Sequence, residues 1–220
     1  MIEAVVFDFD GVLANSEPLH LRAYQQVLAA RGVTLTRDDY YGKYLGFDDE
    51  GVFSRVSRTH GPAIGSAEMR GLIREKSVVF DRLIESDGLL YPGTAACVER
   101  MGDAFPLGIA SGALKHEILA ILIRGGLEGR FQFIVACGDT AEGKPAPDPY
   151  RLAATLHGLP PSACVAIEDS REGIASAKAA GLACIGITHS YPAPVLRLAD
   201  RVVDSLDDIT PELVRTLKPD

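Results

Sequence analysis

The 220-residue sequence lacks the features that mark several specialised classes of protein. It contains no internal repeat, no low-complexity tract and no apolar stretch long enough to span a bilayer, which argues against fibrous and membrane-spanning proteins. It also lacks an excess of basic residues, because 22 lysines and arginines face 30 aspartates and glutamates and give a formal net charge of -8. We therefore expect a cytoplasmic chain that binds neither nucleic acid nor membranes, while small anionic ligands stay allowed.

Cysteine is scarce, and the CxxC spacing of metal and redox motifs is missing. The four cysteines are scattered among small and apolar neighbours, at Cys97, Cys137, Cys164 and Cys184. A metal or redox role would need histidine or cysteine partners at ligand spacing. We therefore expect reduced residues of the hydrophobic core.

Short apolar runs alternate with helical patterns over much of the chain. The predicted strands lie at 105–110, 131–137, 163–169, 183–188 and 201–204, together with the "VVFDFD" run near the N-terminus. Helical patterns at 148–157 and 171–180 separate some of them. This alternation predicts an α/β fold, with a parallel sheet covered by helices.

The residues between about 16 and 87 interrupt this alternation with consecutive helical patterns. The first has Ser16 as its expected N-cap, Pro18 in its first turn and Gly32 as its stop, and another covers 66–88. A helical block inserted after the first strand predicts a separate lobe, joined by linkers at 12–15 and 86–91. We therefore predict a core domain from 1–14 and 89–220 and an α-helical cap domain from 15–88.

The run "VVFDFDG" ends a buried strand on two carboxylates. Side chains alternate along a strand, so Asp8 and Asp10 should point to one side, and Phe7 and Phe9 to the other. Two like charges this close are costly unless a cation lies between them or one stays protonated.

Three further segments place polar residues at or near strand ends. Ser111 and Gly112 follow one strand, Lys144 lies in a loop before a helix, and Glu168 and Asp169 end another strand. The carboxyl ends of parallel strands share one edge of the sheet, where ligands bind in open α/β folds. The sequence therefore predicts one site at that edge.

Two motifs resemble binding loops but do not match them fully. "GDTAEGKP" (138–145) has the phosphate-loop spacing, but Pro145 replaces the hydroxyl residue that would bind magnesium. "DFDG" (8–11) resembles a calcium loop, but its glycine comes too early and a strand precedes it.

Taken together, "DFDGVL", the strand-ending Ser111, "GKPAPD" and "EDSREGIASAKAAG" resemble the haloacid dehalogenase superfamily, in the branch of β-phosphoglucomutase and phosphoglycolate-type phosphatases. The resemblance implies a Rossmann-like parallel sheet core with an inserted α-helical cap. It also implies a magnesium-dependent phosphatase that hydrolyses a small phosphorylated metabolite. The match covers both ends of the chain well and the inserted helices much less well.

The resemblance assigns roles to individual residues. It makes Asp8 the nucleophile that forms an aspartyl-phosphate and Asp10 the general acid and base, so the pKa of Asp10 should lie above that of Asp8. Mg²⁺ would be held by Asp8, the backbone carbonyl of Asp10 and Asp169, with Glu168 close by.

The remaining roles concern the substrate. Ser111 and the Gly112 backbone would bind phosphate oxygens, and Lys144 would balance negative charge. His20 matches a histidine that bridges core and cap in the mutase, and we expect it among the substrate-binding residues. His60, His116, His157 and His189 form no constellation, so we expect them at the surface or at helix ends.

Two alternatives stay open. A phosphoacceptor receiver module also pairs acids, a lysine and magnesium, but it has no inserted lobe and its acceptor follows a later strand. A sugar-phosphate mutase would need cationic groups in the cap to bind a second phosphate. The stretch "KYLGFDDEG" (43–51) instead carries Asp48, Asp49 and Glu50, for which Lys43, Arg55 and Arg58 could compensate. We favour a hydrolase, and we expect a monomer.

Overall fold

The structure is a computed structural model, and it describes residues 1–60, 65–84 and 89–217. Its strands are β1 Ala4–Phe7, β2 Leu107–Ala110, β3 Ile134–Val135, β4 Cys164–Glu168, β5 Ala183–Ile187 and β6 Arg201–Val203. Its α-helices are α1 Glu17–Ala29, α2 Arg37–Asp39, α3 Asp49–His60, α4 Ser66–Leu83, α5 Thr94–Gly102, α6 Lys115–Arg124, α7 Asp148–His157, α8 Arg171–Ala180 and α9 Pro211–Thr216.

The strands form one parallel sheet in the order β3-β2-β1-β4-β5-β6, which confirms the predicted fold class. Strand β1 lies in the interior of this sheet, with Phe7 paired to Ile109 of β2 and to Ile167 of β4. The carboxyl ends of β1, β2 and β4 therefore meet side by side. Edge strand β3 is shorter than the predicted 131–137 and covers Ile134–Val135 alone, because it pairs only with β2.

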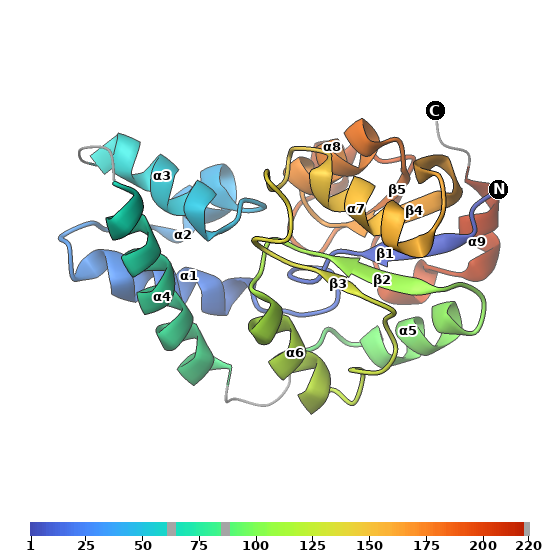
Figure 1. Cartoon of the computed structure of the whole chain (residues 1–220), viewed down its shortest axis with the longest axis horizontal. Helices are drawn as coiled ribbons and strands as arrows, with labels where there is room; N and C mark the ends of the chain where they lie inside the picture. The colour runs from blue at the N-terminus through green and yellow to red at the C-terminus, as the bar shows by residue number, and fades with distance from the viewer. Residues whose placement is uncertain (61–64, 85–88, 218–220) are drawn as a thin grey trace.

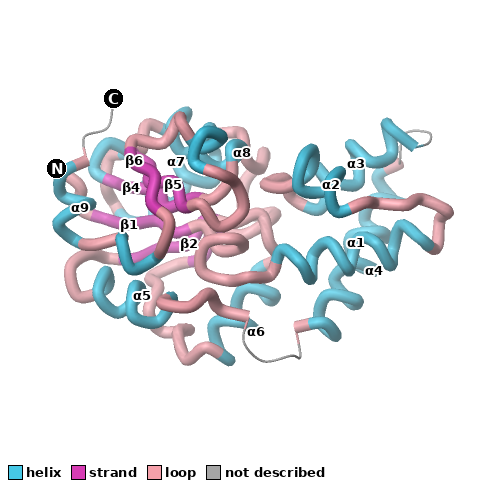
Figure 2. The backbone as a smooth tube through the Cα atoms, turned by 180° about the vertical axis from the view of Figure 1, so that it is seen from behind, coloured by secondary structure: helices cyan, strands magenta, loops and turns pink. Residues whose placement is uncertain are grey.

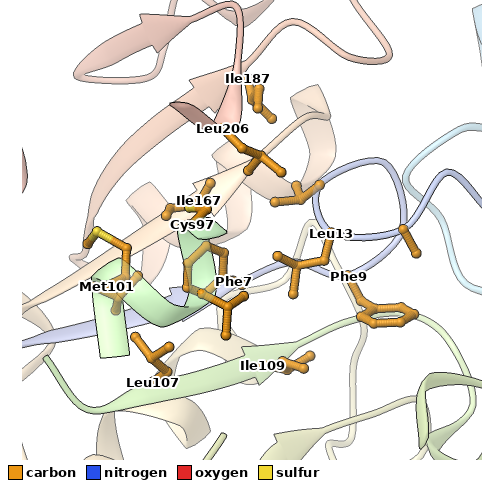
Figure 3. Packing of buried hydrophobic residues seen from close by; sticks show 14 of the residues in the cluster. Phe7, Phe9, Leu13, Cys97, Met101, Leu107, Ile109, Ile167, Ile187 and Leu206 are labelled. Carbon is orange, nitrogen blue, oxygen red and sulfur yellow. The ribbon is translucent and has the colours of Figure 1, made fainter. Parts of the chain in front are cut away.

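Both faces of the sheet are covered by helices, as Figure 1 shows. Val5 and Phe7 belong to the hydrophobic cluster on the side of α5, α6 and α9, whereas Ala4 and Val6 belong to the cluster with α7 and α8. Figure 3 shows Phe7 and Phe9 within the first of these clusters. Burial on both faces explains why the strand sequences are almost continuously apolar.

Helices α1 to α4 form a lobe of their own beside the sheet, which we call the helical lobe (Figures 1 and 2). Its hydrophobic cluster includes Tyr24 of α1, Phe53 of α3 and Leu72 of α4. Helices α1 and α4 pack side by side across this cluster. The lobe lies beyond the carboxyl ends of the strands, where it can cover a site at that edge.

The two chain segments that lead into and out of the helical lobe run next to each other. The backbone N–H of Asn15 donates to the Leu89 carbonyl at 2.7 Å, and that of Tyr91 donates to the Leu13 carbonyl at 3.0 Å. The predicted linker end at 86–88, and with it the predicted helix end at Gly88, lies outside the described residues. The division into two domains at these boundaries stays a prediction.

Two predictions from what the sequence lacks can be compared with the structure: the absence of a membrane-spanning stretch and the burial of the few cysteines. No helix among the described residues is long and apolar enough to span a membrane. The four cysteines are free thiols, and three of them are buried as predicted. Cys137 is only partly buried, since it follows edge strand β3.

Candidate active site

A small cavity of about 50 Å³ lies between the sheet and the helical lobe. The sheet side, called the sheet wall, consists of Asp8, Asp10, Ser111, Gly112, Ala113, Lys144, Asp169 and Ser170. The lobe side, called the lobe wall, consists of Glu17, His20, Tyr24, Tyr40, Leu45, Gly46, Phe47, Asp48 and Asp49. All eight predicted site residues except Glu168 thus line one cavity. Glu168 lies directly behind it, with a carboxylate oxygen within 4.8 Å of those of Asp8 and Asp169.

Lys144 ties two of the buried acids together. Its Nζ lies 2.8 Å from Asp8 Oδ1 and 2.6 Å from Glu168 Oε1. Burial and the charge of Glu168 raise the pKa of Asp8 to about 8, and Lys144 opposes this only in part. The two acids in turn raise the pKa of Lys144 despite its burial, which keeps the lysine charged.

Glu168 is fully buried and its oxygens are already engaged. Besides Lys144, it accepts hydrogen bonds from the Tyr150 hydroxyl at 2.7 Å, the Ser170 hydroxyl at 3.1 Å and the Asp169 backbone N–H at 3.2 Å. A carboxylate with this many donors has little capacity left for a further ligand. The geometry therefore suits Glu168 to positioning Lys144.

Asp169 differs from Glu168 because its Oδ2 is buried without a hydrogen-bond partner among the residues the structure describes. Burial and the charges of Asp8 and Glu168 raise its pKa well above the usual range. Gly11 leaves room for this oxygen: a Cβ there would lie 1.9 Å from it, and the φ of +78° also favours glycine.

The acids of the sheet edge fit a divalent cation. Asp8, Glu168 and Asp169 offer oxygen atoms within 4.8 Å of one another, and Lys144 alone cannot neutralise three carboxylates. The Oδ2 of Asp169 is buried without a hydrogen-bond partner among the described residues, and a bound cation would satisfy this oxygen. A hard, oxygen-only donor set is what Mg²⁺ prefers.

Asp10 has a different environment from Asp8. The Ser16 hydroxyl donates to its Oδ1, and His20 Nε2 lies 3.3 Å from the same oxygen. Burial raises the pKa of Asp10, but His20 and Ser16 outweigh it and hold that pKa below the ordinary value. The pKa of His20 is raised: burial and Lys76 lower it, and Asp10 more than compensates.

The two aspartates therefore have separated pKa values, but in the opposite order to the one we expected. The reason is the distribution of charge, since Asp8 faces other carboxylates and Asp10 faces a histidine. A cation at Asp8 would lower the pKa of Asp8. The Asp10–His20 pair is better described as a unit that shares one proton.

Ser16 has a role that the sequence did not reveal. It occupies the N-cap position of α1 as predicted, but its side chain makes no capping hydrogen bond. Its hydroxyl instead points to Asp10. A serine just before a helix looks the same in the sequence whether its hydroxyl caps the helix or binds another side chain.

Ser111 and Gly112 follow the end of β2, which flanks β1 on the side away from β4. The Ser111 Oγ accepts the Ala113 backbone N–H at 3.1 Å, which leaves its proton available for a ligand oxygen. A Cβ at Gly112 would contact the Asp48 backbone at 3.6 Å, so the lobe wall closes tightly over this turn.

The lobe wall contains functional candidates that were missed from the sequence. The Tyr40 hydroxyl donates to Glu17 Oε2 at 2.6 Å, and burial raises the pKa of Glu17 to about 7. The Tyr24 hydroxyl donates to Asp49 Oδ1 at 2.5 Å. A sequence signal did exist, since Glu17, His20 and Tyr24 recur at helical spacing and form a polar stripe on the buried face of α1.

The other histidines divide into two kinds. His116 is exposed at the start of α6, and His157 lies in the last turn of α7, as predicted. His189 contradicts the expectation, because it stacks on Tyr91 at 3.9 Å and its Nδ1 lies 2.9 Å from the Gly11 carbonyl. The side chain of His60 lies outside the described part of the chain.

The parallel sheet and the buried acids and lysine at its carboxyl edge define an α/β enzyme whose acidic cluster could hold a cation. The model of the haloacid dehalogenase-like hydrolases matches residues 2–181. The chain belongs to this family, and it is a hydrolase of the haloacid dehalogenase superfamily.

Three similar proteins illustrate the family. Hexitol phosphatase B of Escherichia coli is 31% identical over 219 residues, which cover 95% of each chain. A crystal structure of CbbY from Rhodobacter sphaeroides in complex with xylulose-(1,5)bisphosphate has a TM-score of 0.84 at 31% identity, covering 94% of this chain and 96% of that one. A β-phosphoglucomutase from Clostridium difficile has a TM-score of 0.87 at 23% identity over 98% and 96% of the two chains, which shows a shared fold.

Proposed function

We propose that this hydrolase is a magnesium-dependent phosphatase that acts on a small phosphorylated carbohydrate through an aspartyl-phosphate intermediate. The observation that carries the proposal is the convergence of Asp8, Asp169, Lys144 and Ser111 on one cavity at the carboxyl edge of the sheet. The name of the hexitol phosphatase and the xylulose bisphosphate bound to CbbY support the substrate class.

Side-chain oxygens of Asp8 and Asp169 and the backbone carbonyl of Asp10 would hold Mg²⁺. The ion would supply positive charge that offsets the repulsion between Asp8 and the phosphate. Glu168 acts behind these ligands by holding Lys144 against Asp8, at 2.6 and 2.8 Å.

Asp8 attacks phosphorus with a carboxylate oxygen. A bond forms between that oxygen and phosphorus, while the bond from phosphorus to the sugar oxygen breaks. Lys144, the Ser111 hydroxyl and the Gly112 backbone N–H bind the equatorial phosphate oxygens and stabilise the charge that they carry.

Asp10 moves protons for both halves of the reaction. The proton that it shares with His20 goes to the departing sugar oxygen, and Asp10 then accepts a proton from the water that cleaves the aspartyl-phosphate. Ser16 and His20 bind the same Asp10 oxygen, which fixes the carboxylate for this task.

Phosphate release from a panel of phosphorylated sugars and polyols, with Mg²⁺, tests the function. The mutase alternative is tested by adding β-glucose 1-phosphate with a catalytic amount of the 1,6-bisphosphate. We expect free phosphate to accumulate. Efficient formation of glucose 6-phosphate with little free phosphate would favour the mutase, and no turnover of any ester would contradict both. Monomeric state and cytoplasmic location stay predictions.

A further inference from the structure

The lobe wall of the cavity is acidic, and this affects which charged groups a substrate can place against it. Among the described residues, the lobe wall contains three carboxylates, Glu17, Asp48 and Asp49, and no lysine or arginine. Lys144 is the cation of the sheet wall, and it is already paired with Asp8 and Glu168.

Asp49 is the centre of a buried network at this wall. Its Oδ1 accepts the Tyr24 hydroxyl at 2.5 Å and lies 3.1 Å from Lys76 Nζ. Lys76, from α4, is 1% exposed and also lies 3.5 Å from Glu117 of α6. Lys76, which contacts the lobe-wall residue Asp49, is thus bound by two acids, and this leaves it little attraction for a substrate anion.

Asp49 Oδ2 is also buried, and it has no hydrogen-bond partner among the described residues. An ionised carboxylate oxygen only accepts hydrogen bonds, so a hydroxyl group is the ligand that completes it. A phosphate brought to the same place would add two like charges at a site with little water.

The basic residues that could have compensated lie elsewhere. Lys43 is exposed and pairs with Asp39 at 2.6 Å. Arg55 lies over the ring of Phe47 at 3.4 Å and donates to the Gly51 carbonyl at 3.2 Å. Arg58 is exposed on α3. None of the three lines the cavity, as far as the described residues show.

We propose that Asp49 determines specificity: it accepts a hydroxyl of the substrate, binds Lys76 and so excludes a second phosphate. The inference rests on the proposed phosphatase function, and it narrows the substrate to monophosphates whose far end is an uncharged polyol or sugar. This chain would then differ from the CbbY that was crystallised with a bisphosphate, despite 31% identity.

The test compares matched pairs of substrates, such as fructose 6-phosphate with fructose 1,6-bisphosphate. Wild type should prefer the monophosphate by about 100-fold in kcat/KM, because like charges at an interface cost several kcal/mol. Asp49→Asn keeps the volume and removes the charge, so this ratio should fall at least about tenfold, chiefly through a lower KM for the bisphosphate. Asp38→Asn, the same change at an exposed position of the helical lobe, should leave the ratio unchanged.

Binding to the Asp8→Asn variant, measured by calorimetry with Mg²⁺, separates this inference from the function itself. Tighter binding of the monophosphate supports the role of Asp49 even if no ester is hydrolysed, in which case the phosphatase proposal alone fails. Equal or tighter binding of the bisphosphate, or no binding of the monophosphate, overturns the inference. Equal turnover of the two substrates by wild type also overturns the inference, and this result does not depend on whether Asp49→Asn folds.

Discussion

The two walls of the cavity are built from different kinds of structure. The sheet wall takes its polar residues from the ends of β1, β2 and β4 and from the loop before α7, so the paired strands hold them in place. The lobe wall takes its polar residues from one face of α1, from the turn at Tyr40 and from the start of α3.

The difference in structure corresponds to a difference in chemistry. On the sheet wall, Asp8, Glu168 and Asp169 lie close to one another, and Lys144 alone cannot neutralise all three, so a bound cation would stabilise them. On the lobe wall, Tyr24 and Tyr40 donate to Asp49 and Glu17, and these acids are positioned without a metal. We infer that the sheet wall carries out the reaction and the lobe wall selects the substrate.

The largest effect should come from Asp8→Asn on the sheet wall. Losing the nucleophile should lower kcat by at least about 10⁴-fold. Without Mg²⁺ the variant should melt at a higher temperature than wild type, because one of three repelling buried carboxylates is gone. Phosphate release and thermal unfolding measure the two effects, with Asp38→Asn as the control. Activity within about tenfold of wild type would exclude Asp8 as nucleophile.

Removing the metal should have the next largest effect. A chelator should abolish turnover, Ca²⁺ should restore it poorly because its looser coordination misplaces the reacting groups, and Asp169→Asn should raise the Mg²⁺ requirement. A readout without substrate is also available. Saturating Mg²⁺ should raise the melting temperature of wild type and not that of Asp169→Asn. Full activity in excess chelator would contradict the metal site.

Asp10→Asn should lower turnover of sugar phosphates by about 10²–10⁴-fold, since it removes the proton donor and acceptor. The loss should be smaller with p-nitrophenyl phosphate, whose leaving group departs with little help from an acid. Parallel kcat measurements on the two substrates give the comparison. Equal losses on both would place the role of Asp10 outside leaving-group protonation.

A smaller effect is expected for the pKa of His20 in the Asp10→Asn variant. In wild type, Asp10 raises the pKa of His20 above its usual value against burial and the charge of Lys76, which both lower it. Asp10→Asn removes the raising charge, so the pKa of His20 should fall below the usual value. An NMR titration of the imidazole protons measures the shift. An unchanged pKa would mean that Asp10 and His20 do not share a proton.

The smallest effect is expected for Lys43→Ala on the exposed side of the helical lobe. The ion pair of Lys43 with Asp39 is open to solvent, and such pairs contribute little to stability. Melting temperature and the ratio of monophosphate to bisphosphate turnover should both match wild type. A changed ratio would show that Lys43 reaches the substrate, contrary to its position here.

Much of the sheet wall could be predicted from the sequence because it depends on local patterns. Runs such as "VVFDFD" predict a strand and its end together, and parallel strand ends share one edge. Asp8, Ser111 and Asp169 therefore converge without any knowledge of side-chain packing. The sequence predicts a longer β3 than the structure has, because an edge strand has the same apolar pattern as an interior one.

The lobe wall could not be predicted in this way, because it depends on how helices pack. The contact of Lys76 with Glu117 joins residues 41 positions apart on α4 and α6. Its contact with Asp49 depends on how α3 and α4 pack. Nothing local in the sequence distinguishes such a buried lysine from a solvated one.

The most direct test of the central claim is to search for the phosphoryl group on Asp8. Wild type turning over a sugar phosphate with Mg²⁺ is quenched in acid within milliseconds, and the peptide that contains Asp8 is analysed by mass spectrometry. We predict a phosphorylated Asp8 during turnover that disappears when substrate is exhausted, and no modification in Asp8→Asn. Steady release of phosphate with Asp8 unmodified at every quench time would contradict the account.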